Sequence, residues 1–353
     1  MSVPTLEGIT ARPITTNRIT TRVLFSGDEG GTPVIFVHGN ASSATYWETT
    51  MLALPSGYRG IAYDQRGFGD ADRDKIIDST RGAGDLADDL AALMDTLSIE
   101  KAHVVGHSAG GSVLWHFLMD YPQRVLTCTM AAPASPYGFG GTKGEDGQPI
   151  WPDYAGSGGG TVNGDFVKMI ADGERGTDNP ASPRNTMNAF YWKPPFVPER
   201  EEDYLSSMLT THVGEDAYPG DMTASTNWPN VAPGTKGLIN ALTPKYAKDI
   251  QHLFAIDPKP PILWIHGTDD QIVSDNSFFE MGTLGKAGLI PGYPGEDVYP
   301  PQPMIAQIRA VLEKYQAAGG EYEEVALPET GHSPYIEKPA EFNAAFHAWL
   351  KKA

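Results

Sequence analysis

The first 133 residues alternate between short, continuously apolar runs and segments whose apolar residues recur with a helical period. Runs of this kind predict strands that are buried on both faces, as in a parallel sheet. The spacing of Leu86, Leu90, Leu93 and Leu97 predicts a helix over Asp85–Leu97. The predicted strands are Pro33–His38, Arg59–Tyr63, the run through Val104 and Val105, and Val125–Ala132. Strands alternating with helices indicate an α/β fold with a mostly parallel, doubly wound sheet.

The pattern changes at Pro133. From there to about Lys259 the chain is rich in glycine, proline, asparagine and aromatic residues. It contains few periodic apolar positions, so we interpret it as an insertion between two strands that has no separate core. Three stretches predict helices within it: Asn185–Trp192, Glu199–His212 and Leu238–Phe254.

The alternating pattern returns near the C-terminus. Strands are predicted at Pro261–His266 and Tyr322–Leu327, and helices at Met304–Ala317 and Ala340–Leu350. A second insertion, Gly282–Pro303, is again rich in glycine and proline. An opening pair of strands is predicted around Thr15–Phe25 and the turn at 28–31. We therefore expect a core of residues 1–133 and 260–353 with an inserted cap over 134–259.

The pentapeptide Gly106-His107-Ser108-Ala109-Gly110 stands between a predicted strand and the helical segment Ser112–Tyr121. Gly-x-Ser-x-Gly in this place is the nucleophile-elbow pattern, a turn so tight that its serine is strained. The flanking glycines remove side chains that would clash. A serine that only caps the helix would fit the same five residues.

Polar residues also follow the other apolar runs, at His38-Gly39, Asp64-x-Arg66, Asp270 and His332. The carboxyl ends of parallel strands share one edge of a sheet, where ligands bind. These residues are therefore expected to converge with Ser108, in the chain order serine, aspartate, histidine. Asp269 competes with Asp270 for the role of the aspartate.

With these motifs the sequence resembles the α/β-hydrolase superfamily, over roughly Val23–Ala132 and Pro261–Leu350. The resemblance implies that Ser108 is the nucleophile, His332 the general base and Asp270 the acid. It also implies an oxyanion hole made by the backbone N–H groups of Asn40 and Ala109. The fold it implies is a mostly parallel doubly wound sheet with an inserted, mainly helical cap.

The remaining candidates are assigned to structure or to the pocket. His38 is expected to hold the oxyanion loop, and Asp64 and Arg66 are expected to form an ion pair. The other histidines show no metal-ligand spacing, so neither a metal nor another cofactor is expected. The side chains considered for a pocket lining are His107, Trp151, Tyr154, Phe190, Tyr191, Trp192 and Trp228, with packing inside the cap as the alternative.

A serine nucleophile implies acyl chemistry rather than attack by a carboxylate, which epoxide hydrolases use on the same fold. We expect hydrolysis of a small, fairly apolar carboxylic ester or lactone. A perhydrolase, a carbon–carbon bond hydrolase and a proline-type aminopeptidase would use the same triad. The peptidase would need cap carboxylates, for which Glu199, Glu201, Glu202 and Asp203 are available. A non-catalytic sensor of a small ligand is the alternative from another class.

Composition limits the partners and the compartment. The formal net charge of −18 argues against nucleic acid and anionic membranes as partners. The single cysteine, Cys128, cannot form an internal disulfide, and Met1–Arg12 lacks an apolar signal core. We therefore expect a cytoplasmic protein that acts on a small molecule, as a monomer or a homodimer.

Overall fold

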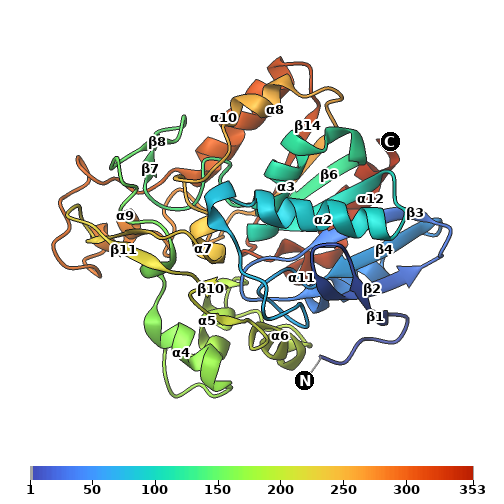
Figure 1. Ribbon diagram of the computed structural model, residues 1–353, viewed down its shortest axis with the longest axis horizontal. Coiled ribbons are helices and arrows are strands. Elements are labelled where there is room, and N and C mark those ends of the chain that lie inside the picture. The colour runs from blue at the N-terminus through green and yellow to red at the C-terminus, as the bar shows by residue number, and fades with distance from the viewer. Residues whose placement is uncertain (1–2, 353) are drawn as a thin grey trace.

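The computed structural model describes residues 3–352, and its centre is one eight-stranded sheet (Figure 1). The strand order is β1-β2-β4-β3-β5-β6-β13-β14. All neighbours from β4 to β14 pair in parallel, and only β1 and β2 run antiparallel to their neighbours. The strands are β1 (Thr10–Thr15), β2 (Thr20–Gly27), β3 (Thr32–Val37), β4 (Tyr58–Tyr63), β5 (Ala102–His107), β6 (Val125–Ala131), β13 (Ile262–Gly267) and β14 (Tyr322–Leu327).

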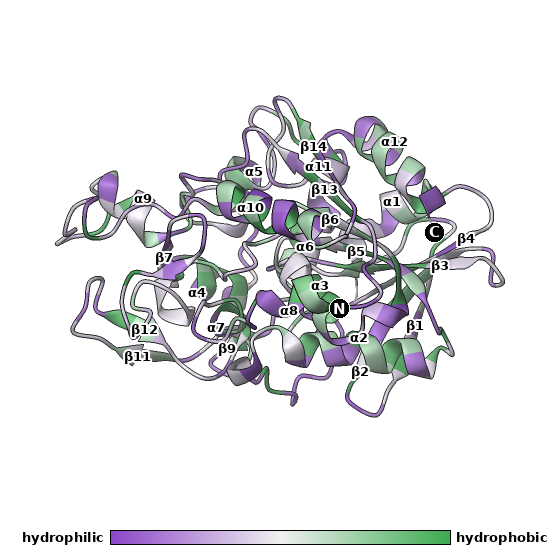
Figure 2. Ribbon diagram, turned by 90° about the horizontal axis from the view of Figure 1, so that it is seen from above, coloured by the Kyte–Doolittle hydropathy of each residue, from purple (hydrophilic) through white to green (hydrophobic). Residues whose placement is uncertain are grey.

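Helices cover both faces of this sheet (Figures 1 and 2). On one face, α3 packs on β5 and β6, beside α2 and α8, and α10 packs on β14. On the other face lie α1, α11 and α12, where Phe36 of β3 meets Phe346 of α12. The helices of the core are α1 (Glu48–Leu52), α2 (Gly84–Thr96), α3 (Ala109–Asp120), α10 (Met304–Ala317), α11 (Pro334–Glu337) and α12 (Pro339–Trp349). The helix α8 (Gln251–Ala255) belongs to the end of the first insertion and packs against α3 and α10.

The predicted doubly wound sheet is confirmed. The central strands β5 and β13 are buried at every position, which explains why their sequences show no polar alternation. The predicted bounds of the last strand and of α10 agree with the structure, and the other core elements differ by one to three residues. The opening pair is the hairpin of β1 and β2, whose turn lies between Thr15 and Thr20 and not at 28–31.

The first insertion, residues 134–259, contains short helices and two-residue or three-residue strands. The helix predicted over Leu238–Phe254 is wrong, because two short helices stand there with Pro244 between them. The sequence prediction also missed α4. The helices of the first insertion are α4 (Gly164–Asp172), α5 (Pro183–Phe190), α6 (Glu201–Met208), α7 (Leu238–Ala241) and α8. Its strands are β7 (Thr142–Lys143), β8 (Gln148–Pro149), β9 (Val213–Gly214), β10 (Tyr218–Pro219), β11 (Met222–Ala224) and β12 (Val231–Pro233).

The two insertions pack against each other, on the side of the molecule where Figures 1 and 2 place β11 and the helix α9 (Met281–Lys286). Trp228, Met281 and Tyr299 form a small apolar cluster that is separate from the main core. The Trp228 indole N–H donates to the carbonyl of Pro291 at 2.9 Å. The Tyr299 hydroxyl donates to the carbonyl of Ala155 at 3.2 Å. Side chains from both insertions are thus needed to form this small core.

Candidate active site

Ser108 stands at the sharp turn between β5 and α3. Its backbone has φ 53° and ψ −117°, a conformation that a residue with a side chain adopts only under strain. The residue is the N-cap of α3, where free N–H groups and the helix dipole favour negative charge. Strain at a helix N-terminus is the geometry expected of a nucleophile elbow.

The two flanking glycines are required by close contacts. A Cβ on Gly106 would lie 2.7 Å from the carbonyl oxygen of Gly110. A Cβ on Gly110 would lie 2.4 Å from the carbonyl oxygen of Val37 and 2.6 Å from that of His38. These obstacles are backbone atoms that cannot rotate away. The elbow therefore packs directly against the carboxyl end of β3.

His332 and Asp270 form a buried pair at the carboxyl ends of β14 and β13. The distance between His332 Nδ1 and Asp270 Oδ2 is 2.8 Å, and both side chains are at most 3% exposed. Asp270 Oδ1 accepts the backbone N–H groups of Ile272 at 2.7 Å and Val273 at 3.0 Å. Asp269, the alternative by sequence, is partly exposed and pairs with Lys193 at 3.1 Å. The structure thus joins His332 to Asp270 and not to Asp269.

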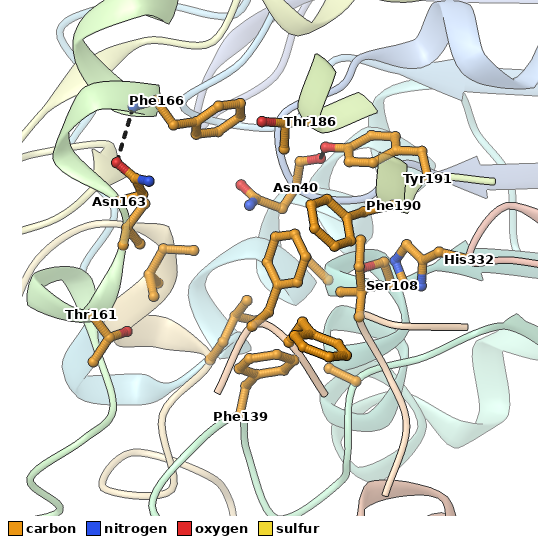
Figure 3. Close-up of a pocket in the computed structure, with 18 of the residues that line it drawn as sticks. Asn40, Ser108, Phe139, Thr161, Asn163, Phe166, Thr186, Phe190, Tyr191 and His332 are labelled. Carbon is orange, nitrogen blue, oxygen red and sulfur yellow. Dashed lines mark hydrogen bonds between the residues drawn. The ribbon is translucent and has the colours of Figure 1, made fainter. Parts of the chain in front are cut away.

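Ser108 and His332 line the same cavity, and Figure 3 shows their side chains next to each other. Because the Asp270 carboxylate accepts from Nδ1, the Nε2 atom of His332 is left without a proton when the ring is neutral. No hydrogen bond joins the serine hydroxyl to the ring within residues 3–352. The arrangement thus places the unprotonated Nε2 of a neutral His332 ring beside the Ser108 hydroxyl.

The loop after β3 carries Asn40 and is fixed by buried contacts. Nε2 of His38 accepts the backbone N–H of Gln65 at 2.9 Å, and Nδ1 lies 2.8 Å from the carbonyl oxygen of Gly39. Burial lowers the pKa of His38 to about 4, so the ring stays neutral. Asn40 then lines the cavity beside Ala109, whose N–H begins α3 and lacks a partner inside the helix.

His107 lies beside the His332 ring, with 4.7 Å between the ring centroids. Its Nε2 donates to the backbone carbonyl of His332 at 2.9 Å, and its Nδ1 lies 3.3 Å from the Tyr335 hydroxyl. Burial, with the neighbouring His332, lowers the pKa of His107 well below its ordinary value. His107 is therefore neutral and supports the turn that carries His332.

The cavity has a volume of about 440 Å³ and apolar walls. It runs from Ser108 and His332 at one end to Thr161 and Asn163 at the other (Figure 3). Among the lining residues, all within the described chain, there is no Asp, Glu, Lys or Arg. Its phenylalanines are Phe139, Phe166, Phe190, Phe278 and Phe279. An uncharged, aromatic-walled cavity of this size suits a neutral small molecule.

Of the side chains considered for the pocket, His107, Phe190 and Tyr191 line this cavity. The others, Trp151, Tyr154, Trp192 and Trp228, do not. Trp192 is buried against Tyr204 and Phe196. Trp228 belongs to the cluster between the two insertions, and Trp151 packs against that cluster. The other phenylalanines of the lining, Phe139, Phe166, Phe278 and Phe279, were not predicted, because sequence gives no signal that separates a cavity wall from core packing.

The expected ion pair between Asp64 and Arg66 is not formed. Arg66 makes two hydrogen bonds to Asp89, at 2.9 and 2.7 Å. Asp64 instead accepts the backbone N–H groups of Ala44 at 2.9 Å and Asp70 at 3.0 Å. The Asp64 carboxylate thus joins the loop that follows β3 to the loop that follows β4.

Between residues 3 and 352, no three His, Cys, Asp or Glu side chains are grouped so that they could bind a metal ion. Over the same residues, no helix has both the length and the apolar character needed to cross a bilayer.

The model of the family described as "alpha/beta hydrolase fold" matches residues 32–278. The AB hydrolase superfamily protein YfhM of Bacillus subtilis is 36% identical over 119 residues, which are 33% of this chain and 41% of that protein. Epoxide hydrolase 2 of Siraitia grosvenorii is 38% identical over 121 residues, 34% of this chain and 37% of that protein. The match thus spans about two fifths of these relatives' length.

Among solved structures, the carboxylesterase CesB of Bacillus subtilis superposes with a TM-score of 0.58 at 17% identity. The superposition covers 98% of this chain and 92% of that one. At this identity the likeness concerns the fold. It extends over nearly the whole chain, beyond the shorter stretch that aligns with the relatives in sequence.

Proposed function

Since the chain belongs to the alpha/beta hydrolase fold family, we propose that it is a serine hydrolase that cleaves small, fairly apolar carboxylic esters or lactones through an acyl-serine intermediate. One observation carries the proposal. A strained serine and a histidine that is paired with a buried aspartate, each from a different strand end, line one cavity without charged residues in its walls. A hydroxyl with a base beside it supports acyl transfer.

In the first step His332 Nε2 takes the proton of the Ser108 hydroxyl as its oxygen attacks the substrate carbonyl carbon. Asp270 keeps the proton of His332 on Nδ1 and stabilises the imidazolium. The backbone N–H groups of Asn40 and Ala109 bind the oxyanion, each contributing about 3 kcal/mol. The imidazolium then protonates the departing alcohol oxygen, and the acyl group remains on Ser108.

In the second step a water molecule replaces the alcohol. His332 removes a proton from the water, whose oxygen attacks the acyl carbon, and the same N–H groups bind the second oxyanion. Collapse of this intermediate returns the proton to Ser108 and releases the carboxylic acid. With a lactone, the alcohol and the acid are parts of one molecule, so nothing leaves between the two steps.

The lining of the cavity supports a neutral substrate. An ionised group placed there would lose its hydration and meet no side chain of opposite charge. The aromatic walls offer contact area without charge, which favours aryl or branched alkyl groups of an ester. The relative named epoxide hydrolase 2 offers no direct analogy, because the residue at the elbow here is a serine.

The carboxylates that a proline-type aminopeptidase would need are engaged elsewhere. Glu201 pairs with Arg184 at 3.0 Å, and Asp203 pairs with Arg200 at 2.9 Å. Glu202 contacts Arg175 and Arg184. None of these carboxylates, nor Glu199, lines the cavity in the described structure, so a substrate α-amino group would find no counter-charge there.

The test is covalent labelling followed by a substrate panel. A fluorophosphonate should react stoichiometrically, with the adduct on the peptide containing Ser108, and Ser108→Ala should remain unlabelled while keeping its melting temperature. Neutral p-nitrophenyl esters, lactones, aminoacyl amides and hydrogen peroxide with acetate would then be compared. Absence of labelling in the folded protein would overturn the proposal and favour a sensor. Turnover of aminoacyl amides above all esters would favour the peptidase.

A further inference from the structure

Three consecutive residues after α5, Tyr191–Lys193, touch both halves of the candidate site, and we refer to them as the strap. On one side, the Tyr191 hydroxyl donates to the carbonyl oxygens of Asn40 at 3.1 Å and Ala41 at 3.4 Å. Those carbonyls belong to the loop whose Asn40 N–H would bind the oxyanion. The contact is buried, since Tyr191 is only 7% exposed.

On the other side, the strap lies directly against the turn that carries His332. A Cβ on Gly331 would stand 2.6 Å from the backbone nitrogen of Lys193 and 2.6 Å from the carbonyl carbon of Trp192. The two backbones are therefore in contact, with no side chain between them. A displacement of the strap toward the turn would therefore press on Gly331, the residue immediately before His332.

One carboxylate joins these two backbones. Glu337 Oε2 accepts the N–H of Gly331 at 2.7 Å and the N–H of Lys193 at 3.1 Å. Burial raises the pKa of Glu337, and both N–H contacts oppose that rise by favouring the charged form. Glu337 does not line the cavity, so it cannot act on a substrate directly.

The strap is itself fixed to the first insertion. The Trp192 indole N–H donates to Asn188 Oδ1 at 3.2 Å, and its ring packs against Tyr204 of α6. The turn of His332 also accepts the hydrogen bond from His107 of β5. The turn is thus clamped between the sheet and the insertion.

We propose that the strap and Glu337 are a positioning device that keeps the His332 turn and the Asn40 loop in register with each other. This inference rests on the proposed function, because it assigns a role in that reaction. It gives the first insertion a second task besides walling the cavity. A displacement of about 0.5–1 Å of a base or an oxyanion donor is enough to lower kcat strongly.

The first test compares variants of Glu337. Glu337→Ala leaves the N–H groups of Gly331 and Lys193 without this acceptor. Glu337→Asp shortens the side chain by one methylene, so that its oxygen lies farther from both N–H groups. Glu337→Gln keeps an acceptor oxygen, and Glu341→Ala removes an exposed carboxylate nearby as the matched control. For a p-nitrophenyl ester we expect kcat to fall about 10- to 50-fold in the Ala and Asp variants, with KM within threefold. The Gln variant and the control should stay within threefold of wild type.

A second readout does not depend on turnover. The proton on His332 Nδ1, bound to Asp270, should give a downfield NMR resonance that Glu337→Gln retains and Glu337→Ala shifts or broadens. If both resonance and kcat were unchanged in the Ala and Asp variants, the positioning role would be overturned. The same follows if Gln were as damaging as Ala. Melting temperatures identify any variant that loses activity only because it unfolds. If Glu337→Ala is such a variant, the Glu337→Asp variant decides whether the positioning role holds.

A double-mutant cycle tests whether the strap is one unit. Tyr191→Phe removes the contact with the Asn40 loop and should lower kcat by roughly three- to tenfold. If the strap couples both sides, Tyr191→Phe with Glu337→Ala should lower kcat by clearly less than the product of the single effects. A loss equal to that product would mean two independent contacts. Failure of the proposed function is recognised separately, because wild type would then not react with the fluorophosphonate.

Discussion

Asp270→Asn should be far more damaging than its size suggests, because the hydrogen bonds around Asp270 dictate how the amide must lie. Oδ1 is held by two backbone donors, the N–H groups of Ile272 and Val273. An asparagine must therefore keep its carbonyl oxygen there. Its NH₂ group would then occupy the place of Oδ2, which lies 2.8 Å from His332 Nδ1.

Two donors cannot share that contact, so the histidine would respond by moving its proton to Nε2. Nε2 would then present a proton to Ser108 instead of accepting one, and the serine would lose its base. Forcing the wrong tautomer in this way lowers kcat by about 10⁴ in a serine protease triad. We expect a loss of about 10³–10⁴ in kcat here, which corresponds to a barrier about 4–5.5 kcal/mol higher.

The assay is steady-state hydrolysis of a neutral p-nitrophenyl ester, followed from pH 6 to 9, with melting temperatures measured alongside. Asp269→Asn is the matched control. The Asp269 carboxylate is partly exposed, pairs with Lys193 and accepts the Thr268 hydroxyl, so its variant should stay within about threefold of wild type. An Asp270→Asn variant that folds and retains more than a tenth of wild-type kcat would refute the tautomer argument.

Three further outcomes are expected. Gly110→Ala should destabilise the protein by about 2–3 kcal/mol in urea unfolding and remove most activity, because its Cβ would meet the carbonyl oxygen of Val37 at 2.4 Å and push α3 away. Burial lowers the pKa of His116 to about 4, so the stability that its neutral ring contributes is present above pH 6.5 and is lost as the pH falls toward 4. Between pH 7.5 and 5.5, the free energy of unfolding of His116→Gln in urea should therefore fall by about 1 kcal/mol less than that of wild type. The carboxylate product should inhibit more weakly than the alcohol product, since no cation lines the cavity to retain it.

The sheet could be predicted from sequence because its strands are buried on both faces. Covered on each side by helices, strands such as β5 and β13 need apolar residues at every position, and turn residues stand where they end. The polar residues that follow those strands could be located from the same pattern, because they stand where each apolar run ends. Because parallel strands end at one edge, Ser108, Asp270 and His332 had to come near each other once the sheet was parallel.

The first insertion could not be predicted to the same degree, because its elements are short and depend on contacts that are distant in sequence. The helix α4 is defined mainly by its ends. The Asn163 side chain accepts from the N–H groups of Asp165 and Phe166, and Gly173 takes a left-handed conformation after the last turn. These capping residues were a readable signal, whereas the pairing of Trp228 with Pro291 was not, since it joins two separate insertions.

The tryptophans and phenylalanines show why a cavity lining is harder to predict than a triad. A triad is defined by residue types that few other roles require. An apolar wall is made of the same residues as any core, and the side of a ring that faces empty space depends on how the insertion sits on the sheet. Trp192 illustrates this, since it lies next to Tyr191 in sequence yet packs into the insertion, whereas Tyr191 faces the cavity.

The insertion has to satisfy two demands that differ in chemistry. Its walls must be apolar and adaptable to admit a substrate, and side chains such as Phe190 and Phe279 provide this. Under the proposed function, its contact with the His332 turn must be rigid, and backbone hydrogen bonds to Glu337 provide this rigidity. Tyr191 belongs both to the wall and to the strap. Replacing wall residues outside the strap, such as Phe279, should therefore change which substrate is accepted without moving His332. Substrate preference and turnover would then vary separately in this fold, because different atoms of neighbouring residues determine them.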